Sequence, residues 1–123
     1  MAKKIVVVDD EEAIRDALND VLTSSGYQVI LAADGKEGAE KVKSEKPDLI
    51  ISDLMMPGVS GGKMASVLEG DAATKNIPII FLTGVVNDEE AKLTGHKMAG
   101  QYLLAKPFDN NELLAMVDLA MKK

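Results

Sequence analysis

Five short runs of apolar residues, many of them β-branched, alternate along this chain with segments that have the periodicity of amphipathic helices. The runs span residues 5–8, 29–32, 49–52, 79–82 and 102–105. A continuous apolar run of this length, bounded by turn residues, is typical of a strand buried on both faces. Such strands, alternating with helices, indicate a doubly wound parallel sheet.

The helical segments follow each apolar run. They are expected at residues 13–22, 36–46 and 61–69, from residue 88 onward, and after Asp109, which is expected to cap the last one. Right-handed crossovers would place these helices on both faces of the sheet. We therefore expect one α/β domain over residues 1–123, with a doubly wound five-stranded parallel sheet of strand order 2-1-3-4-5 and five helices, as in flavodoxin-like folds.

Composition narrows the class of protein further. The 123 residues suffice for one domain with a single core. The net charge of −6 argues against direct binding of nucleic acid, and the lack of cysteine rules out a disulfide framework. No apolar stretch approaches the roughly 20 residues that a membrane helix needs. We expect a soluble, cytoplasmic protein without a membrane segment.

Charged or hydroxyl-bearing side chains that could take part in a reaction follow four of the five runs. They are Asp9 and Asp10, then Asp53, then Thr83, and finally Lys106. In a parallel sheet these strand ends gather at one edge, and strands one and three flank the switch point where ligands bind. Each residue alone also has a simpler interpretation, as a helix cap, a turn residue or a solvated strand end. It is harder to explain in that way why four strand ends all carry such residues.

The clustered carboxylates require a compensating charge. Mg²⁺ binds carboxylate and water oxygens, and Lys106 would add a second cation beside the hydroxyl of Thr83. Transfer of a phosphoryl group to a carboxylate needs an ionised nucleophile, cations that neutralise the phosphoryl oxygens and a hydrogen-bond donor to one of them. The sequence therefore predicts a phosphoryl-accepting site with Asp53 as its nucleophile.

The chain resembles the receiver domain of two-component response regulators over essentially its whole length. The matching segments are residues 6–10, residues 53–57 with Gly61, residues 82–84 and residues 106–108. The resemblance implies that Asp53 is the phosphoacceptor, and that Asp10, Asp53 and the main-chain carbonyl of Met55 bind Mg²⁺. Asp9 would act through a metal-bound water, and Thr83 and Lys106 would hold the phosphoryl oxygens.

The same resemblance implies the partners. The donor would be a phosphohistidine on a sensor histidine kinase or a histidine phosphotransfer protein. The signal would pass to a downstream protein target or to an output domain that this sequence lacks, through the face made by the fourth helix, the fifth strand and the fifth helix. Gly95 and Gly100 weaken that fourth helix. The chain would be a regulator rather than an enzyme, with self-phosphorylation and slow autodephosphorylation at most.

Two features depart from the family pattern or vary within it. Family members usually carry an aromatic residue three positions before the lysine, whereas Leu103 stands there and Tyr102 lies one step earlier. Adjacent strand residues face opposite sides, so Tyr102 cannot serve as the usual switch without a shift in register. Residues two past the phosphoacceptor and two past the threonine tune loss of phosphate in the family. Here they are Met55 and Val85, both apolar.

Other functions remain open at this point. An aspartyl-phosphate hydrolase of the haloacid-dehalogenase group would need a second acid where Met55 stands. A nucleotide or flavin phosphate is disfavoured, because the first strand is followed by acids at residues 9–12 and not by a glycine-rich loop. An adaptor with the same fold that is not phosphorylated is the remaining alternative.

Overall fold

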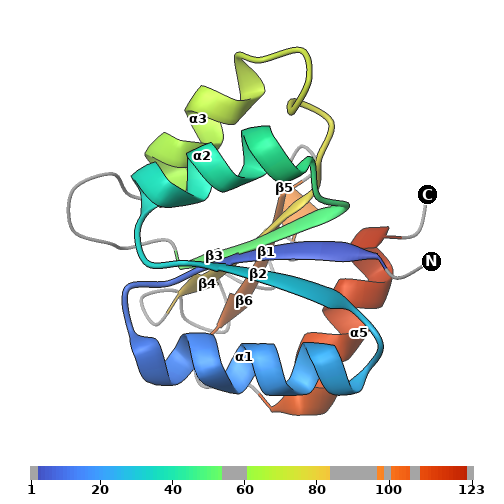
Figure 1. Cartoon of the computed structure of the whole chain (residues 1–123). Helices are drawn as coiled ribbons and strands as arrows, with labels where there is room; N and C mark the ends of the chain where they lie inside the picture. The colour runs from blue at the N-terminus through green and yellow to red at the C-terminus, as the bar shows by residue number, and fades with distance from the viewer. Residues whose placement is uncertain (1–2, 54–60, 84–96, 99–100, 106–108, 122–123) are drawn as a thin grey trace.

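The computed structural model describes residues 3–53, 61–83, 97–98, 101–105 and 109–121. In chain order, and with the labels of Figure 1, the elements are β1 (Lys4–Val8), α1 (Glu12–Ser24), β2 (Gln28–Ala32), α2 (Gly35–Glu45), β3 (Leu49–Asp53), α3 (Gly61–Glu69), β4 (Ile79–Thr83), β5 (Lys97–Met98), β6 (Gln101–Ala105) and α5 (Asn110–Met121). Most of the fourth helix expected from residue 88 onward lies outside the described residues. Its expected second half is wrong where it is described, because Lys97 and Met98 form the strand β5 instead.

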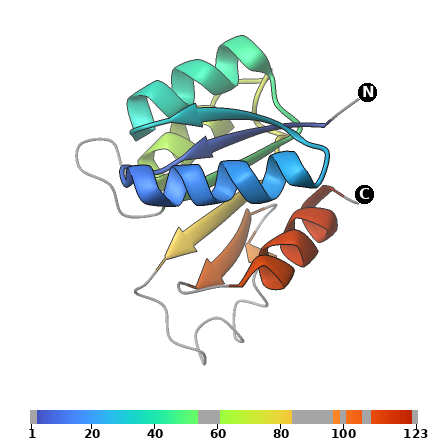
Figure 2. The ribbon, with the colours of Figure 1, turned by 60° about the horizontal axis from the view of Figure 1, so that its bottom comes forward.

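The sheet has the strand order β2-β1-β3-β4-β6-β5. Its first five strands pair in parallel, and they are the five predicted strands in the predicted order, since β6 is the expected fifth strand. Figure 2 shows the arrowheads of these parallel strands directed to the same side of the molecule. The two-residue strand β5 pairs antiparallel with β6 and was not predicted, because Lys97 and Met98 are too short a run to give a strand pattern.

Helices cover both faces of the sheet, with α2 and α3 on one side and α1 and α5 on the other (Figure 1). The alternation of side chains along β1 creates two apolar cores. Ile5 and Val7 pack in the core that includes residues of α1 and α5, whereas Val6 and Val8 pack in the core that includes residues of α2 and α3. The central strand β3 is buried along its whole length, which confirms the prediction made from its apolar run.

Local hydrogen bonds define the ends of the helices. Helix α2 begins at Gly35, because Asp34 Oδ1 accepts a hydrogen bond from the main-chain N–H of Glu37 at 2.8 Å. Glu37 Oε1 in turn accepts a hydrogen bond at 2.6 Å from the main-chain N–H of Ala33, the residue before the N-cap, in an arrangement similar to a capping box. The helix expected over residues 36–46 therefore begins one residue earlier, at Gly35. The predicted cap of α5 is confirmed, since Asp109 Oδ1 accepts from Glu112 N at 2.7 Å.

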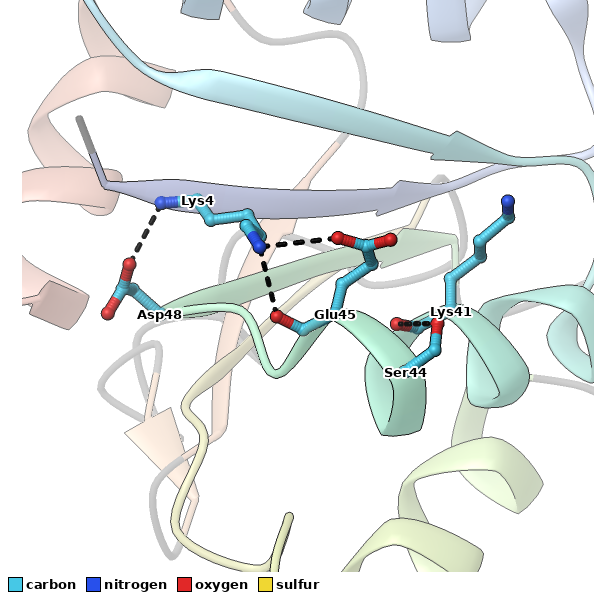
Figure 3. Close-up of polar contacts among 5 residues, drawn as sticks. All are labelled: Lys4, Lys41, Ser44, Glu45 and Asp48. Carbon is cyan, nitrogen blue, oxygen red and sulfur yellow. Dashed lines mark hydrogen bonds and ion pairs between the residues drawn. The ribbon is translucent and has the colours of Figure 1, made fainter. Parts of the chain in front are cut away.

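At the amino-terminal ends of β1 and β3, Lys4 connects β1 to the end of α2 and to the residue before β3 (Figure 3). Its Nζ lies 3.2 Å from both the main-chain oxygen and Oε1 of Glu45 at the end of α2. Its main-chain N–H donates to Asp48 Oδ2 at 2.8 Å. A cation at a helix C-terminus also interacts favourably with the helix dipole, so Lys4 fixes the end of α2 against the start of β1. None of the helices within the described ranges is long and apolar enough for a bilayer.

Candidate functional site

The ends of β1 and β3 lie side by side at the carboxyl edge of the sheet. These two strands are paired, and their register ends with Val8 opposite Ser52. The next residue of each chain segment is an aspartate, Asp9 after β1 and Asp53 as the last residue of β3. Asp9 is 0% exposed and Asp53 is 7% exposed. Two acids that are normally found in water are thus held in the protein interior at adjacent strand ends.

Four carboxylates gather at this position. One oxygen from each of Asp9, Asp10, Glu11 and Asp53 lies within 4.8 Å of the corresponding atoms of the others. Asp10 and Glu11 are exposed, while Asp9 and Asp53 are buried. The structure therefore brings together the three predicted acids, Asp9, Asp10 and Asp53. Glu11 joins them, although in the sequence it is only one member of the acidic run 9–12.

The donor set of this acidic cluster fits a divalent cation. Carboxylate oxygens are hard ligands, and like charges at these separations repel one another unless a cation lies among them. A cluster that combines exposed and buried acids can contribute ligands from one side while water fills the other positions, as Mg²⁺ requires. Mg²⁺ bound there would supply positive charge for a negatively charged substrate.

Main-chain and side-chain hydrogen bonds hold Asp9 in this cluster. Its main-chain N–H donates to Ala32 O on β2 at 3.1 Å, and its Oδ1 accepts from Glu11 N at 2.9 Å. The second of these bonds folds the chain back, which explains why Glu11 joins the cluster. The half-buried Arg15, in the first turn of α1, donates from Nη1 to the main-chain oxygen of Asp9 at 2.7 Å. Arg15 has no distinguishing signal in the sequence, because a single basic residue on a helix looks like a surface charge.

Asp53 is held by its neighbour on β3. Ser52 is fully buried, and its Oγ donates to the main-chain oxygen of Asp53 at 2.9 Å. On the other side, β3 is in register with β4, with Asp53 opposite Leu82. In the sequence Ser52 is one residue of the apolar run 49–52, and a hydroxyl between Ile51 and Asp53 has no signal of its own.

The remaining predicted site residues are described only in part. Thr83 is the last residue of β4, and β4 is the neighbour of β3, so Thr83 lies at the same edge as Asp53. The register pairs Thr83 with Ala105, the last residue of β6 and the one before Lys106. Lys106 and Met55 lie outside the described residues.

Tyr102 lies in the core and not on the surface of the sheet. It is 8% exposed and packs in the same core cluster as Leu104, on the face covered by α1 and α5. The absence of the usual aromatic switch at Leu103 remains a prediction.

Comparison with known proteins gives a consistent result. The family model for the response regulator receiver domain matches residues 5–118. The chain is 34% identical over 123 residues to the phosphate regulon transcriptional regulatory protein PhoB of Klebsiella pneumoniae, covering all of this chain and 53% of that protein. It is 40% identical over 124 residues to the alkaline phosphatase synthesis transcriptional regulatory protein PhoP of Bacillus subtilis (strain 168), covering all of this chain and 50% of that protein. The chain thus spans about half the length of these curated relatives.

Solved structures agree with this result. The chemotaxis protein CheY4 of Vibrio cholerae superposes with a TM-score of 0.84 at 31% identity, over 98% of this chain and 99% of that one. The receiver domain of the Francisella response regulator 1452 superposes with a TM-score of 0.82 at 27% identity, over 97% of this chain and 96% of that one.

Proposed function

The chain belongs to the response regulator receiver domain family, the phosphoacceptor domains of two-component signalling, and we propose that Asp53 is its phosphoacceptor. The observation that carries this assignment is the acidic cluster at the ends of β1 and β3, where Asp53 is 7% exposed and lies against Asp9, Asp10 and Glu11. Asp53 is the last residue of β3, so the strand fixes its backbone at the carboxyl edge of the sheet.

The proposed reaction moves a phosphoryl group from a histidine nitrogen to a carboxylate oxygen. An oxygen of Asp53 attacks phosphorus in line, and the P–O bond forms as the P–N bond breaks. A proton on the other ring nitrogen of the histidine allows the ring to leave as neutral imidazole. Mg²⁺, when bound, neutralises the charge on the phosphoryl oxygens. Asp10, Asp53 and the carbonyl of Met55 are proposed to hold this ion.

The other site residues have supporting roles in the proposal. Asp9 would hold a water in the coordination shell of the metal. The Thr83 hydroxyl and the Lys106 ammonium would bind the transferred phosphoryl oxygens, a role supported by the position of β4 and β6 as successive neighbours of β3. Apart from its own phosphorylation and slow loss of phosphate, the chain is proposed to catalyse no reaction.

The proposed partners are a phosphohistidine donor and a receiver of the signal. The donor would be a sensor histidine kinase or a histidine phosphotransfer protein, and a cytoplasmic location is part of the same proposal. The signal would leave through the face made by the fourth helix expected from residue 88 onward, the fifth strand of the predicted sheet (β6) and α5, toward a protein target or an output domain. Curated relatives that are about twice as long carry names of transcriptional regulators. The domain itself carries a net charge of −6 and is not proposed to bind nucleic acid directly.

Phosphorylation by a small acyl phosphate tests the assignment. Acetyl phosphate with Mg²⁺ is expected to add one phosphoryl group to the chain, and hydroxylamine is expected to remove it, because acyl phosphates are cleaved by this nucleophile. Tandem mass spectrometry after borohydride trapping should place the group on Asp53. Asp53→Asn is the matched variant, since it keeps the shape of the side chain and removes the nucleophile. Uptake of hydroxylamine-labile phosphate by Asp53→Asn at the rate of the unchanged chain would contradict the proposal.

A further inference from the structure

Ser52 is a buried polar residue that is surrounded by apolar side chains. It is 0% exposed and lies on β3, opposite Val8 of β1 and Phe81 of β4. By the alternation of side chains along a strand it shares its face with Ile50, and Val8, Phe81 and Ile50 all belong to the core beside α2 and α3. A hydroxyl is unfavourable in such surroundings unless it forms a hydrogen bond.

The hydrogen bond of Ser52 goes to the phosphoacceptor residue itself. Oγ lies 2.9 Å from the main-chain oxygen of Asp53. The register between β1 and β3 ends with Val8 opposite Ser52, one residue before Asp53. The Ser52 hydroxyl therefore acts where the sheet ladder ends, and it fixes the peptide plane that follows Asp53.

We propose that Ser52 is a positioning residue for the phosphoacceptor site, holding Asp53 in the orientation that metal binding and phosphoryl transfer require. This inference rests on the proposed function of Asp53. A fixed peptide plane restricts the backbone of Asp53, and with it the direction of a carboxylate that must serve both as a metal ligand and as a nucleophile. Groups that orient ligands in this way strongly affect metal affinity, although they do not touch the metal. Ser52 is not a catalytic residue, because its hydroxyl binds the main chain and not the substrate.

The structure offers a matched control for the loss of this bond. Thr74 is 2% exposed, and its Oγ1 donates to the main-chain oxygen of Leu68 at 2.7 Å. It lies in the segment between α3 and the amino end of β4, away from the carboxyl edge that carries the acidic cluster. Ser52→Ala and Thr74→Val each remove one buried hydroxyl that is bonded to a main-chain oxygen. They differ in whether that oxygen belongs to the site.

Three measurements decide the matter: the urea midpoint of unfolding, the Mg²⁺ dissociation constant from amide shifts in the absence of phosphodonor, and the rate of phosphorylation by acetyl phosphate. Both variants are expected to unfold at lower urea. Ser52→Ala alone is expected to weaken Mg²⁺ binding and to slow phosphorylation, each by roughly 10-fold. Ser52→Thr retains the hydroxyl and should recover most of both losses.

The proposal is overturned if Ser52→Ala binds Mg²⁺ and accepts phosphate as the unchanged chain does, or if Thr74→Val impairs both to the same degree. If Ser52→Thr does not fold, the comparison of Ser52→Ala with Thr74→Val decides the question by itself. Failure of the unchanged chain to accept phosphate on Asp53 would instead refute the proposed function. The Mg²⁺ affinities would still decide the role of Ser52 in that case.

Discussion

Arg15 donates a hydrogen bond from Nη1 to the main-chain oxygen of Asp9, and the two atoms lie 2.7 Å apart. The bond joins the first turn of α1 to the chain that leaves β1. A similar relationship exists at β3, where the Ser52 hydroxyl binds the main-chain oxygen of Asp53. Arg15 and Ser52 do not belong to the acidic cluster, but they hold the backbone of its two buried aspartates at the carboxyl edge of the sheet.

Loss of the Arg15 guanidinium is expected to loosen this edge. Arg15→Met keeps most of the aliphatic stem and removes the donor, and hydrogen bonds from charged groups contribute about 1.5–3 kcal/mol. Because Arg15 is half-buried, we expect the lower end of that range in the free energy of unfolding from urea titrations. Arg15→Lys should recover only part of it, since an ammonium cannot reproduce the geometry of the planar guanidinium.

A control for Arg15 is available on the exposed surface of α2. Lys43→Met removes one positive charge from an exposed position and should change the free energy of unfolding by less than about 0.5 kcal/mol. If Arg15→Met is as mild as Lys43→Met, the bond to Asp9 contributes little to the stability of the edge.

Repulsion within the acidic cluster predicts an unusual response to substitution. Without metal, Asp53→Asn removes one negative charge from four neighbouring carboxylates, so the variant should be more stable than the unchanged chain by about 1 kcal/mol. Added Mg²⁺ should stabilise the unchanged chain more than the variant, because the variant has lost one carboxylate that can bind the ion. An ion stabilises a protein only to the extent that it binds the folded state. Urea titrations in EDTA and in millimolar MgCl₂ measure both effects. An Asp53→Asn protein that is less stable in EDTA would show that hydrogen bonds to this carboxylate outweigh the repulsion.

Gly38 on α2 allows close contact between the helix and the sheet. A Cβ at this position would lie 2.7 Å from Val8 Cγ2 and 2.9 Å from Met64 Sδ, which is well inside van der Waals contact. Overpacking of this kind costs about 1–3 kcal/mol, and the gain in helix propensity from Gly to Ala offsets up to about 1 kcal/mol of it. Gly38→Ala is therefore expected to lower the free energy of unfolding. Gly70→Ala, where the nearest atom is Val67 O at 3.5 Å, should be nearly neutral in the same urea titrations.

The sequence was sufficient to predict the elements whose signal is local. The apolar runs predicted the five parallel strands, and Asp109 was correctly predicted to cap α5. The order of the strands is not a local signal and was predicted from the doubly wound fold class that their alternation with helices indicates. The hydrogen bonds of Asp34 and Glu37 at the start of α2 were not predicted, because the pair Asp-Gly is also typical of a turn. Strand β5 was missed because two residues carry no periodicity.

The candidate site was predictable in its acids but not in the residues that hold them. Asp9, Asp10 and Asp53 could be placed together because parallel strands end at one edge. The contacts of Arg15 and Ser52 depend on the distance of each donor from a particular main-chain oxygen. Such distances follow from packing in three dimensions, which the residue pattern does not encode.

The lifetime of the phosphorylated state is the last prediction. An aspartyl phosphate is lost when water attacks phosphorus in line, and a polar side chain beside the attack path can orient that water. The positions expected there are Met55 and Val85, which lie outside the described residues. The side chain of Val85 has no hydrogen-bonding group, the thioether of Met55 is only a weak acceptor, and Met55 would also shield the phosphorus. We therefore expect slow autodephosphorylation, which suits a persistent signal or a relay.

Substitution of these two residues tests this expectation. Met55→Asn and Val85→Glu each introduce a polar group beside the attack path and should speed the loss of phosphate from Asp53. The decay can be followed by phosphate release after removal of acetyl phosphate, in the presence of Mg²⁺. Met55→Leu and Val85→Ile are the matched controls, since they change shape without adding a hydrogen-bonding group. Decay of the unchanged phosphoprotein within seconds at room temperature, with no acceleration by either polar substitution, would show that these positions do not limit the attack of water.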